Sequence, residues 1–555
     1  MNDSSDLPAT RTSNARPDSG RGRALYLWGI AFVCGAATMM VELTIVRLLA
    51  PFFGQTVYVW TNIIGVVLGA LAVGYFLGGR LVDRFPSLRL LCGIILAAGV
   101  LFATSPLAVR PLSRFLIAED LPLQEAFQLL NRGSFAVTAL LFGAPMLLLG
   151  MVSPFAVKLV HLQGERVGAG AGTVYAISTV GSLVGTFLPT HVFVPTWGAT
   201  TTVYLAAAAL GLVAAPGIWR GGGAKARAAS MLTIVPLVWL VIEWGSPIER
   251  SQDAIVAKDS AYQFVQVVRK PEEAGGRIEL KLNEGLDSFH SVLVPGQVLT
   301  GGLYYDYFNL MPLLLEDPGQ PFRGLIIGLA AGTVSRQLHH FFEPDPGIEL
   351  DGVEIDPLTV EMGRRYFELD EANQPKLEVI PDQDGRIFLE HTRESYDLVV
   401  IDAYSQQIYI PFHLVSRQFF GLVRDHLRDG GIGAMNVGFY SAGQVDPMKD
   451  PVVAGLANTA AAAFGRVFLA PVENSRNVIL FFRRDDLGTG ELPLEELSKR
   501  AEARPELLAL ASYLSRPGIT REHLFDPDLP VFTDDWAPIE QLSEQSLEST
   551  ARDTR

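Results

Sequence analysis

Cysteine and basic residues are both scarce in this sequence of 555 residues. Its two cysteines, Cys34 and Cys92, fall inside apolar runs, so they predict neither a disulfide framework nor a thiolate metal site. Histidines and carboxylates do not recur at metal-ligand spacing, so we expect no metal site. With 44 Lys and Arg against 59 Asp and Glu, the formal net charge is −15. Nucleic-acid binding requires a basic face, so we expect no nucleic-acid partner.

Charged residues are also fewer than usual, and long apolar runs take their place. Charged residues make up 19% of the chain, and the mean hydropathy is +0.26. After a polar tail over 1–23, which we expect to be disordered, the region 24–247 predicts a polytopic α-helical membrane domain of about seven helices. Its small residues suggest close helix packing. The apolar stretches lie near 24–50, 57–79, 90–109, 134–160, 170–194, 199–218 and 229–246.

Charge in the loops predicts how these helices cross the membrane. The tail and the loops after the second, fourth and sixth stretches are basic, which favours the cytoplasmic side. The last stretch, 229–246, is short and contains Pro236, so an interfacial or re-entrant segment is an alternative to a seventh crossing. A seventh full crossing would place the C-terminal half outside. We favour the alternative because small-molecule co-substrates are made in the cytoplasm, not because of the loop charges, and we expect a multi-pass protein of the cell (inner) membrane with its C-terminal half in the cytoplasm.

The C-terminal half has the periodicity of a different fold. Short alternating runs predict a small β-domain over 254–315. Over 322–485, strand-like runs alternate with helical patterns, which predicts a Rossmann-like, methyltransferase-type α/β domain with a doubly wound parallel sheet. The remainder, 486–555, is polar and predicts a C-terminal helical extension.

Glycines and acids stand where the predicted strands of this α/β domain end. Gly328 and Gly332 form the first strand-to-helix turn, where a backbone can approach a ligand closely. Glu354 follows the second strand, where an acid can accept hydrogen bonds from ribose hydroxyls. Asp384 follows the third strand and Asp402 the fourth. Any one of these carboxylates alone is more often a helix cap or a solvated loop residue. Four such motifs in register at successive strand ends predict a nucleoside site.

These motifs resemble the polyamine aminopropyltransferases, above all spermidine synthase, and specifically a membrane-fused branch of that family. The resemblance covers nearly the whole chain except the two tails. In the N-terminal half it rests on the segments 41–60 and 77–84. In the C-terminal half it rests on Tyr262-Gln263, Tyr304-Tyr305-Asp306, the glycine turn, Val353–Asp356, Asp384-Gly385, Tyr396–Asp402, Ile410–Leu414 and Phe532–Glu540.

The resemblance implies a sulfonium nucleoside as co-substrate, with no tightly bound cofactor. It implies that Gln263 and Glu354 contact the nucleoside, with Asp384 and Gly385 at the adenine. Asp402 takes the place of the catalytic acid, and Tyr304 is expected to fix it by a hydrogen bond. Tyr305, Asp306 and Ser405 occupy the substrate-binding positions.

The chain departs from spermidine synthase on the acceptor side. Ala331 and Ser405 stand where the family has acids that hold ammonium groups. Intact S-adenosylmethionine is therefore an alternative donor to the decarboxylated form, and the partner is a small-molecule amine or S-adenosylmethionine itself. The other expected partner is the lipid membrane, and a homodimer is one option for the assembly.

Three functions remain open from the sequence. The first is transfer of an aminopropyl-type group to an amine, with release of methylthioadenosine. The second is another S-adenosylmethionine reaction, namely a lyase, a cyclisation or a methyl transfer. The third is a nucleoside-gated membrane sensor or transporter without catalysis.

A few further polar residues allow both a structural and a functional interpretation. Glu42 and Arg47 lie in the first apolar stretch, where a pair near the membrane edge is favoured over a polar relay. His413 and His290 are interpreted as core or hydrogen-bonding histidines. Asp534 and Asp535 each fit equally a helix cap and a site-lining residue.

Overall fold

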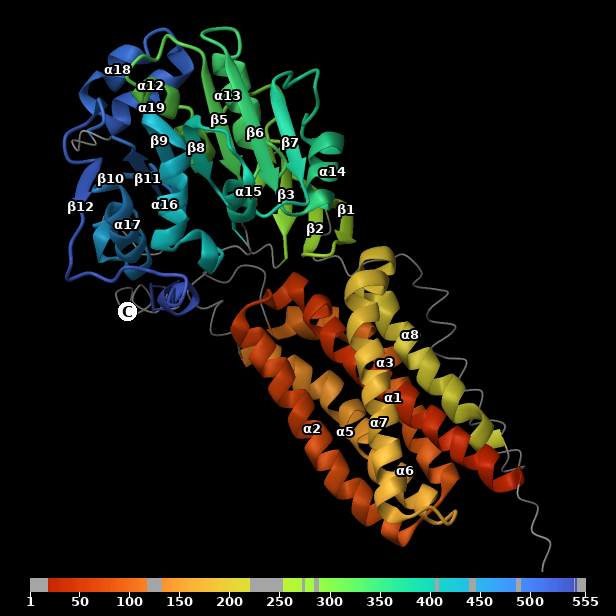
Figure 1. The fold of residues 1–555 in the computed structure, drawn as a ribbon. Helices are drawn as coiled ribbons and strands as arrows, with labels where there is room; N and C mark the ends of the chain where they lie inside the picture. The colour runs from red at the N-terminus through yellow and green to blue at the C-terminus, as the bar shows by residue number, and fades with distance from the viewer. Residues whose placement is uncertain are drawn as a thin grey trace, which may run out of the picture.

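The computed structural model of the chain comprises a bundle of long helices and an α/β part (Figure 1). It describes residues 18–116, 132–219, 253–271, 275–283, 289–404, 409–438, 446–485, 491–543 and 545–546. The predicted seventh apolar stretch, most of the N-terminal tail and Ser405 lie outside these residues.

The bundle is built from the apolar stretches of the N-terminal half. Its elements are α1 (Asp18–Phe53), α2 (Val57–Arg84), α3 (Leu88–Leu116), η1 (Ala139–Gly143), α5 (Ala144–Gly150), α6 (Val152–His161), α7 (Val167–Leu188), η2 (Pro189–Phe193) and α8 (Val194–Trp219). Thr56 caps α2 by accepting the amide of Val59 at 3.2 Å. The structure therefore begins α2 near its predicted start.

The stretches predicted at 170–194 and 199–218 form one continuous helical segment with a sharp break. At Gly198, φ is 83° and ψ is 166°, which is not helical. Glycine reaches this backbone region without the steric cost that a Cβ would bring. The break lets α7 and the rest of α8 both pack against α1 (Figure 1).

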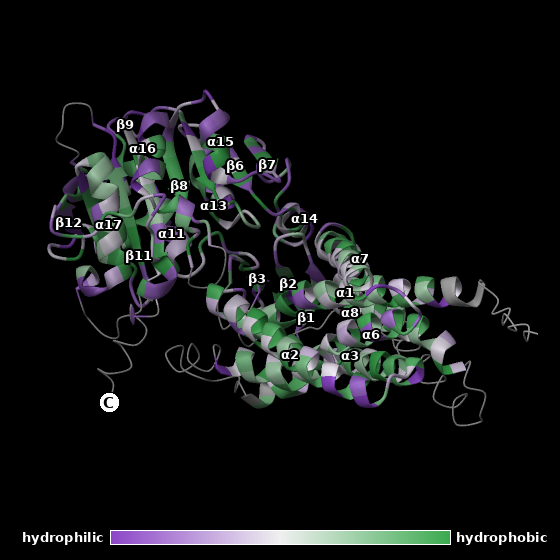
Figure 2. Cartoon of the chain, turned by 60° about the horizontal axis from the view of Figure 1, so that its bottom comes forward, coloured by the Kyte–Doolittle hydropathy of each residue, from purple (hydrophilic) through white to green (hydrophobic). Residues whose placement is uncertain are grey.

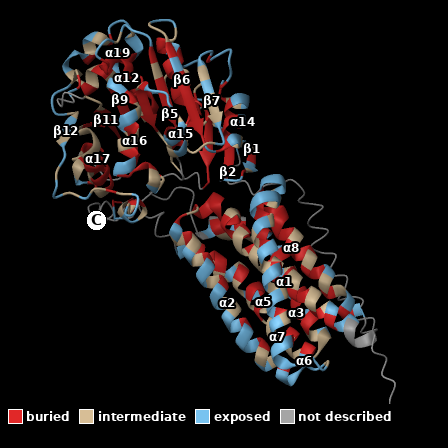
Figure 3. Ribbon diagram, viewed as in Figure 1, coloured by how far each residue is buried: buried red, intermediate tan, exposed pale blue. Residues whose placement is uncertain are grey.

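Five helices of the described residues are long and apolar enough to cross a membrane, by length and composition. Figure 2 shows hydrophobic residues along most of the bundle, whereas the α/β part mixes both kinds. Apolar side chains on α2, including Leu68, Val73 and Phe76, are exposed (Figure 3). An apolar outer surface of this kind is what a lipid-facing helix presents.

Small residues bring the helices of the bundle close together. A Cβ on Gly181 or Gly185 of α7 would lie 2.1 Å from the carbonyl oxygen of Phe32 or Ala36 on α1. A Cβ on Gly74 of α2 would lie 2.2 Å from the carbonyl oxygen of Leu147 on α5. Close packing through small residues is the arrangement expected of membrane helices.

Four short strands form an antiparallel sheet in the order β1-β2-β3-β4. They are β1 (Ala254–Asp259), β2 (Phe264–Arg269), β3 (Ile278–Leu282) and β4 (Ser291–Leu293). Figure 1 shows β1 and β2 at the side of the α/β part that faces the bundle. The connection from β1 to β2, between Asp259 and Phe264, is hydrogen-bonded to the larger sheet through Ser260 and Tyr262.

The larger sheet has eight strands in the order β12-β10-β11-β9-β8-β5-β6-β7. The strands β7 (Leu377–Pro381), β6 (Ile348–Glu354), β5 (Phe322–Ile327), β8 (Tyr396–Ile401) and β9 (Leu427–Gly438) are parallel. The other three are β11 (Asn477–Arg483), β10 (Arg466–Pro471) and β12 (Arg521–Leu524), and each pairs antiparallel with its neighbours in the sheet. The predicted Rossmann-like sheet is confirmed, but it is mixed where we expected parallel strands. The extension that we predicted as helical contributes β12.

Helices cover both faces of this sheet and divide its core into two clusters (Figures 1 and 3). They are α11 (Tyr304–Phe308), α12 (Met311–Leu314), α13 (Thr333–Phe342), α14 (Pro357–Tyr366), α15 (Gly385–His391), η4 (Phe412–Leu414), α16 (Arg417–His426), η5 (Pro447–Lys449), α17 (Pro451–Phe464), η6 (Leu494–Glu496), α18 (Leu497–Arg500) and α19 (Pro505–Leu514). Because parallel strands end at one edge, the loops after β5, β6, β7 and β8 gather there.

Candidate active site

The glycine turn joins β5 to α13 and packs directly against the end of β8. Gly328 has φ 84°, and a Cβ there would lie 2.6 Å from the carbonyl oxygen of Asp402. Gly332 has φ 85° and precedes α13. Ala330 between them also has a positive φ, 49°. The turn therefore needs glycine at Gly328 for two reasons, its backbone angle and its contact with Asp402.

Glu354, the last residue of β6, lies under this turn. One carboxylate oxygen accepts the amide of Ala330 at 2.8 Å, and the other accepts the amide of Asp356 at 3.0 Å. Burial raises the pKa of Glu354 to about 7, against the opposing effect of these amide bonds. The two bonds fix the carboxylate at the strand end, where the sequence predicted a ribose contact.

The connection from β1 to β2 reaches the next two strand ends. Ser260 donates its hydroxyl to the Asp356 carboxylate at 2.7 Å, and the side chain of Gln263 also bonds Asp356. Tyr262 donates its hydroxyl to the Asp382 carboxylate at 3.0 Å. Gln263 thus lies beside the end of β6, which carries Glu354. One ligand could therefore contact both Gln263 and Glu354.

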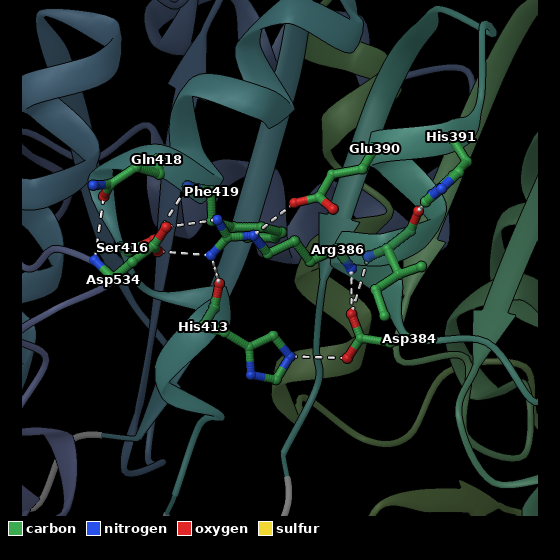
Figure 4. A network of polar contacts seen from close by, with 10 residues as sticks. Asp384, Arg386, Glu390, His391, His413, Ser416, Gln418, Phe419 and Asp534 are labelled. Atoms are coloured by element: carbon green, nitrogen blue, oxygen red, sulfur yellow. Dashed lines mark hydrogen bonds and ion pairs between the residues drawn. The ribbon is translucent and has the colours of Figure 1, made fainter.

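Asp384 begins α15 and is held by bonds on both oxygens (Figure 4). Its Oδ1 accepts the amides of Arg386 and Ile387 at 2.9 and 3.1 Å, while Oδ2 lies 2.8 Å from Nε2 of His413. The His413 bond lowers the pKa of Asp384, although burial opposes it. A Cβ on Gly385 would lie 2.3 Å from Cγ2 of Ile327, so glycine lets α15 approach β5. An adenine amine at Asp384 would share the carboxylate with these partners.

Asp402 follows β8 and is a half-buried acid at the end of this strand. Its Oδ1 accepts the Nδ2–H of Asn436 at 3.0 Å, and Tyr304 also donates to it. Burial raises the pKa of Asp402 to about 6, more than these bonds lower it. Burial and the neighbouring Asp402 raise the pKa of Tyr304 well above its usual value, so Tyr304 stays a hydroxyl donor. The structure thus brings Tyr304 and Asp402 together.

Tyr305 and Asp306 are engaged inside the protein. Tyr305 donates its hydroxyl to the Phe289 carbonyl at 3.0 Å, and its ring lies 4.0 Å from that of Tyr304. The Asp306 side chain is fully buried. Its carboxylate accepts bonds from the amide and hydroxyl of Thr300, the amide of Gly302 and Nε2 of Gln337, all between 2.7 and 3.1 Å. An amine would have to displace one of these bonds to reach Asp306.

Sequence reasoning missed the polar residues on the neighbouring strands. Asn477 donates to Oδ1 of Asn436 at 2.8 Å, and Tyr404 donates to the Asn436 carbonyl at 3.1 Å. The signal that could have identified Asn436 is an amide side chain in the otherwise apolar, buried part of β9 over 431–437, because a buried amide needs partners.

The C-terminal segment is tied to the site by an ion pair (Figure 4). Arg386 binds both carboxylate oxygens of Asp534 at 2.7 Å, and Ser416 donates to the same carboxylate at 2.5 Å. The Arg386 bond lowers the pKa of Asp534 to about 2. Of the two interpretations of Asp534, the structure therefore supports a place beside the site.

The C-terminal half of the chain is similar to several known proteins. Residues 310–437 match the spermine/spermidine synthase domain. A probable polyamine aminopropyl transferase of Bifidobacterium longum is 30% identical over 305 residues, which cover 53% of this chain and 63% of that protein. A polyamine aminopropyltransferase of Vibrio vulnificus is 27% identical over 252 residues, which cover 43% of this chain and 76% of that protein.

Among solved structures, a probable spermidine synthase from Corynebacterium glutamicum aligns with a TM-score of 0.38 and 15% identity. This alignment covers 51% of this chain and 97% of that one. The matched residues 310–437 include the glycine turn, Glu354, Asp384 and Asp402. Residues 310–437 of this chain are thus similar to the spermine/spermidine synthase domain, and the chain spans less than two thirds of the length of the Bifidobacterium relative.

Proposed function

We propose that the chain is an aminopropyltransferase of spermidine-synthase type, which moves an aminopropyl-type group from a sulfonium nucleoside to an amine and releases methylthioadenosine. The observation that carries this proposal is the half-buried Asp402, held by Tyr304 and Asn436 at the strand edge beside the glycine turn. The names of the relatives from Bifidobacterium and Vibrio support the same reaction.

The chemistry needs an amine as its free base. The nitrogen lone pair attacks the methylene carbon next to the sulfonium, the carbon–sulfur bond breaks, and sulfur keeps the bonding pair as a neutral thioether. The nitrogen then loses a proton, which the Asp402 carboxylate accepts. A pKa of about 6 leaves Asp402 ionised at neutral pH and still able to hold a proton briefly. Alignment of nucleophile and leaving group supplies the rest of the rate.

The nucleoside would lie across the ends of β5, β6 and β7. Glu354 would accept the ribose hydroxyls, with Gln263 beside it, and Asp384 with Gly385 would face the adenine. Gly328 and Gly332 leave room for the ligand to approach the backbone of the turn.

Ala331 distinguishes between the decarboxylated and the intact form of S-adenosylmethionine as donor. Ala331 is fully buried, and a Cβ on Gly363 would lie 3.1 Å from its Cα. An alanine offers no carboxylate to the ammonium of a decarboxylated donor. This observation favours intact S-adenosylmethionine as a second candidate, either as an alkyl donor or as the substrate of a lyase, cyclisation or methyl transfer.

The bundle is proposed to be the membrane anchor. Its five long apolar helices and the exposed apolar side chains of α2 support insertion in the cell (inner) membrane. The proposed arrangement keeps the C-terminal half in the cytoplasm, where the sulfonium donor is made, and an amine reaches it from there or from the lipid.

Purified full-length protein in lipid nanodiscs separates the donors. Each donor is incubated with and without a diamine, and the products are identified by mass spectrometry. Methylthioadenosine formed only from the decarboxylated donor with an amine supports aminopropyl transfer. Methylthioadenosine formed from the intact donor without an acceptor contradicts it and supports the second candidate.

A further inference from the structure

The bundle contacts the α/β part through the connection between β1 and β2, which we call the 259–263 loop (Asp259–Gln263). From α1, Arg47 donates an Nη2–H to the carbonyl oxygen of Ala261 at 2.5 Å. From α8, the amide of Ala199 donates to Oδ2 of Asp259 at 3.1 Å. Two helices of the bundle thus bind neighbouring residues of one short loop.

The Asp259 contact caps a helix. Ala199 follows the break at Gly198, so its amide belongs to the first turn of the remaining part of α8, where amides lack partners inside the helix. A carboxylate at that end also interacts favourably with the helix dipole. Burial raises the pKa of Asp259 to about 6, while the Ala199 amide and the charge of Arg47 both favour its ionised form.

The same loop bonds to the predicted nucleoside site on its other side. Ser260 donates to the Asp356 carboxylate at 2.7 Å and accepts the amides of Tyr262 and Gln263 at 3.0 and 2.9 Å. Tyr262 bonds Asp382, one loop further along the sheet edge, at 3.0 Å. A displacement of the loop would therefore move the Gln263 side chain away from Asp356.

Asp356 transmits the contact to the ribose position. Its amide donates to Oε1 of Glu354 at 3.0 Å, and Oδ1 accepts the amide of Leu358 at the start of α14. A continuous path therefore runs from Arg47 through Ala261, Ser260 and Asp356 to Glu354. Every step along it is a hydrogen bond or a peptide bond.

We propose that Arg47 and Asp259 are positioning residues, through which α1 and α8 hold the 259–263 loop against the nucleoside-binding ends of β6 and β7. The bundle is then part of the binding site as well as an anchor. The inference rests on the proposed function for the identity of the ligand, and its test separates the two.

The test uses full-length protein in lipid nanodiscs and the variants Arg47→Gln, Arg47→Lys and Asp259→Asn. The matched control is Arg80→Gln on α2, whose guanidinium lies over the ring of Phe76 at 3.9 Å within the same helix. Two quantities are measured: hydrogen exchange of the amides of Tyr262 and Gln263, and the affinity for methylthioadenosine by calorimetry.

We expect Arg47→Gln and Asp259→Asn to speed exchange at both amides and to weaken methylthioadenosine binding by about tenfold, which is typical of coupling between sites. With the active donor, KM should rise by a similar factor while kcat changes less than about twofold. Arg47→Lys should recover part of the loss because it keeps a charged donor, and Arg80→Gln should match the unaltered protein.

Unchanged exchange in Arg47→Gln would overturn the positioning role, whatever the ligand. Faster exchange with unchanged affinity would overturn its link to the nucleoside site. If the unaltered protein binds no methylthioadenosine, the proposed function fails, while the exchange measurement still decides whether the bundle holds the loop.

Discussion

Nδ2 of Asn436 on β9 lies 3.0 Å from Oδ1 of Asp402 at the end of β8. The orientation of the amide is set from the other side, because Oδ1 of Asn436 accepts a bond from Asn477 on β11 at 2.8 Å. Three adjacent strands therefore fix the direction of one half-buried carboxylate. This is the kind of support that a preorganised catalytic group needs.

Removing Asn436 should change the pH dependence of turnover. Asp402 acts as a base only when ionised, so kcat should rise with pH and level off above its pKa of about 6. The Asn436 bond lowers this pKa, so Asn436→Ala should move the inflection to higher pH. The measurement is kcat from pH 5 to 8 at saturating substrates, with Asn458→Ala, distant on α17, as a control for the loss of a buried amide. An unchanged inflection in Asn436→Ala would contradict the assignment of Asp402.

The same shift has a consequence for folding. The pKa of Asp402 is raised from 3.8 to about 6 in the folded protein, so the folded state binds this proton more tightly than the unfolded state. The proton on Asp402 therefore stabilises the folded state fully below about pH 4. This stabilisation is lost as pH rises from about 4 to about 6 and Asp402 ionises. Asp402→Asn should be stabilised relative to the unaltered protein at pH 7 but not at pH 4, measured by thermal unfolding.

Glu354 should make nucleoside binding depend on pH. Its pKa of about 7 means that it is partly protonated near neutrality, whereas ribose hydroxyls bond best to the ionised form. Affinity for methylthioadenosine should therefore increase as pH rises through 7, with release of a proton. Calorimetry in two buffers of different ionisation enthalpy measures that proton. In Glu354→Gln we expect weaker binding that no longer depends on pH in this range; a retained pH dependence would assign it to another group.

Gly328 allows a test in which backbone angle and close contact are separated. Gly328→Ala would combine a positive φ of 84° with a Cβ 2.6 Å from the Asp402 carbonyl oxygen. Gly518→Ala has nearly the same φ, 82°, with no atom within 4 Å. We expect Gly518→Ala to cost about 1 kcal/mol of stability and to leave turnover unchanged. Gly328→Ala should cost about 1–3 kcal/mol more and lower kcat, because it displaces the Asp402 backbone. Equal effects of the two would show that the contact does not position Asp402.

The sequence predicted the centre of the fold better than its edge. Strands β5 and β8 are largely apolar and β6 alternates apolar with acidic residues, and each ends at or beside a glycine or an acid, so both the strands and the residues at their ends could be identified. β12 has the sequence Arg521-Glu-His-Leu524 and is mostly exposed in the structure. Its three polar residues in a row do not show the alternation of apolar and polar residues that predicts a strand. Its place at the edge of the sheet depends on pairing with β10, a contact between distant segments.

The candidate site divides in the same way. Glu354 and Asp402 could be predicted because Glu354 ends one recognisable strand and Asp402 directly follows another. The partners of Asp306 could not, since Gln337 lies 31 residues away and meets it only in the folded chain. The bond from Arg47 to Ala261 spans 214 residues and joins a helix to a loop, so sequence periodicity contains no trace of it.

Asp402→Asn separates binding from chemistry. It removes the proton acceptor while keeping the size of the side chain and its bond to Tyr304. We expect kcat to fall by about 10²–10⁴-fold and the affinity for methylthioadenosine to change less than about threefold. Loss of both together would indicate a structural role for Asp402.

The most direct measurement follows the transferred group itself. Full-length protein in nanodiscs is incubated with the sulfonium donor and an ¹⁵N-labelled diamine, and the labelled products are identified by mass spectrometry beside an Asp402→Asn control. We expect a labelled amine that has gained one aminopropyl group, one methylthioadenosine for each product, and neither in the control. A donor consumed without any gain of mass on the labelled amine would contradict it.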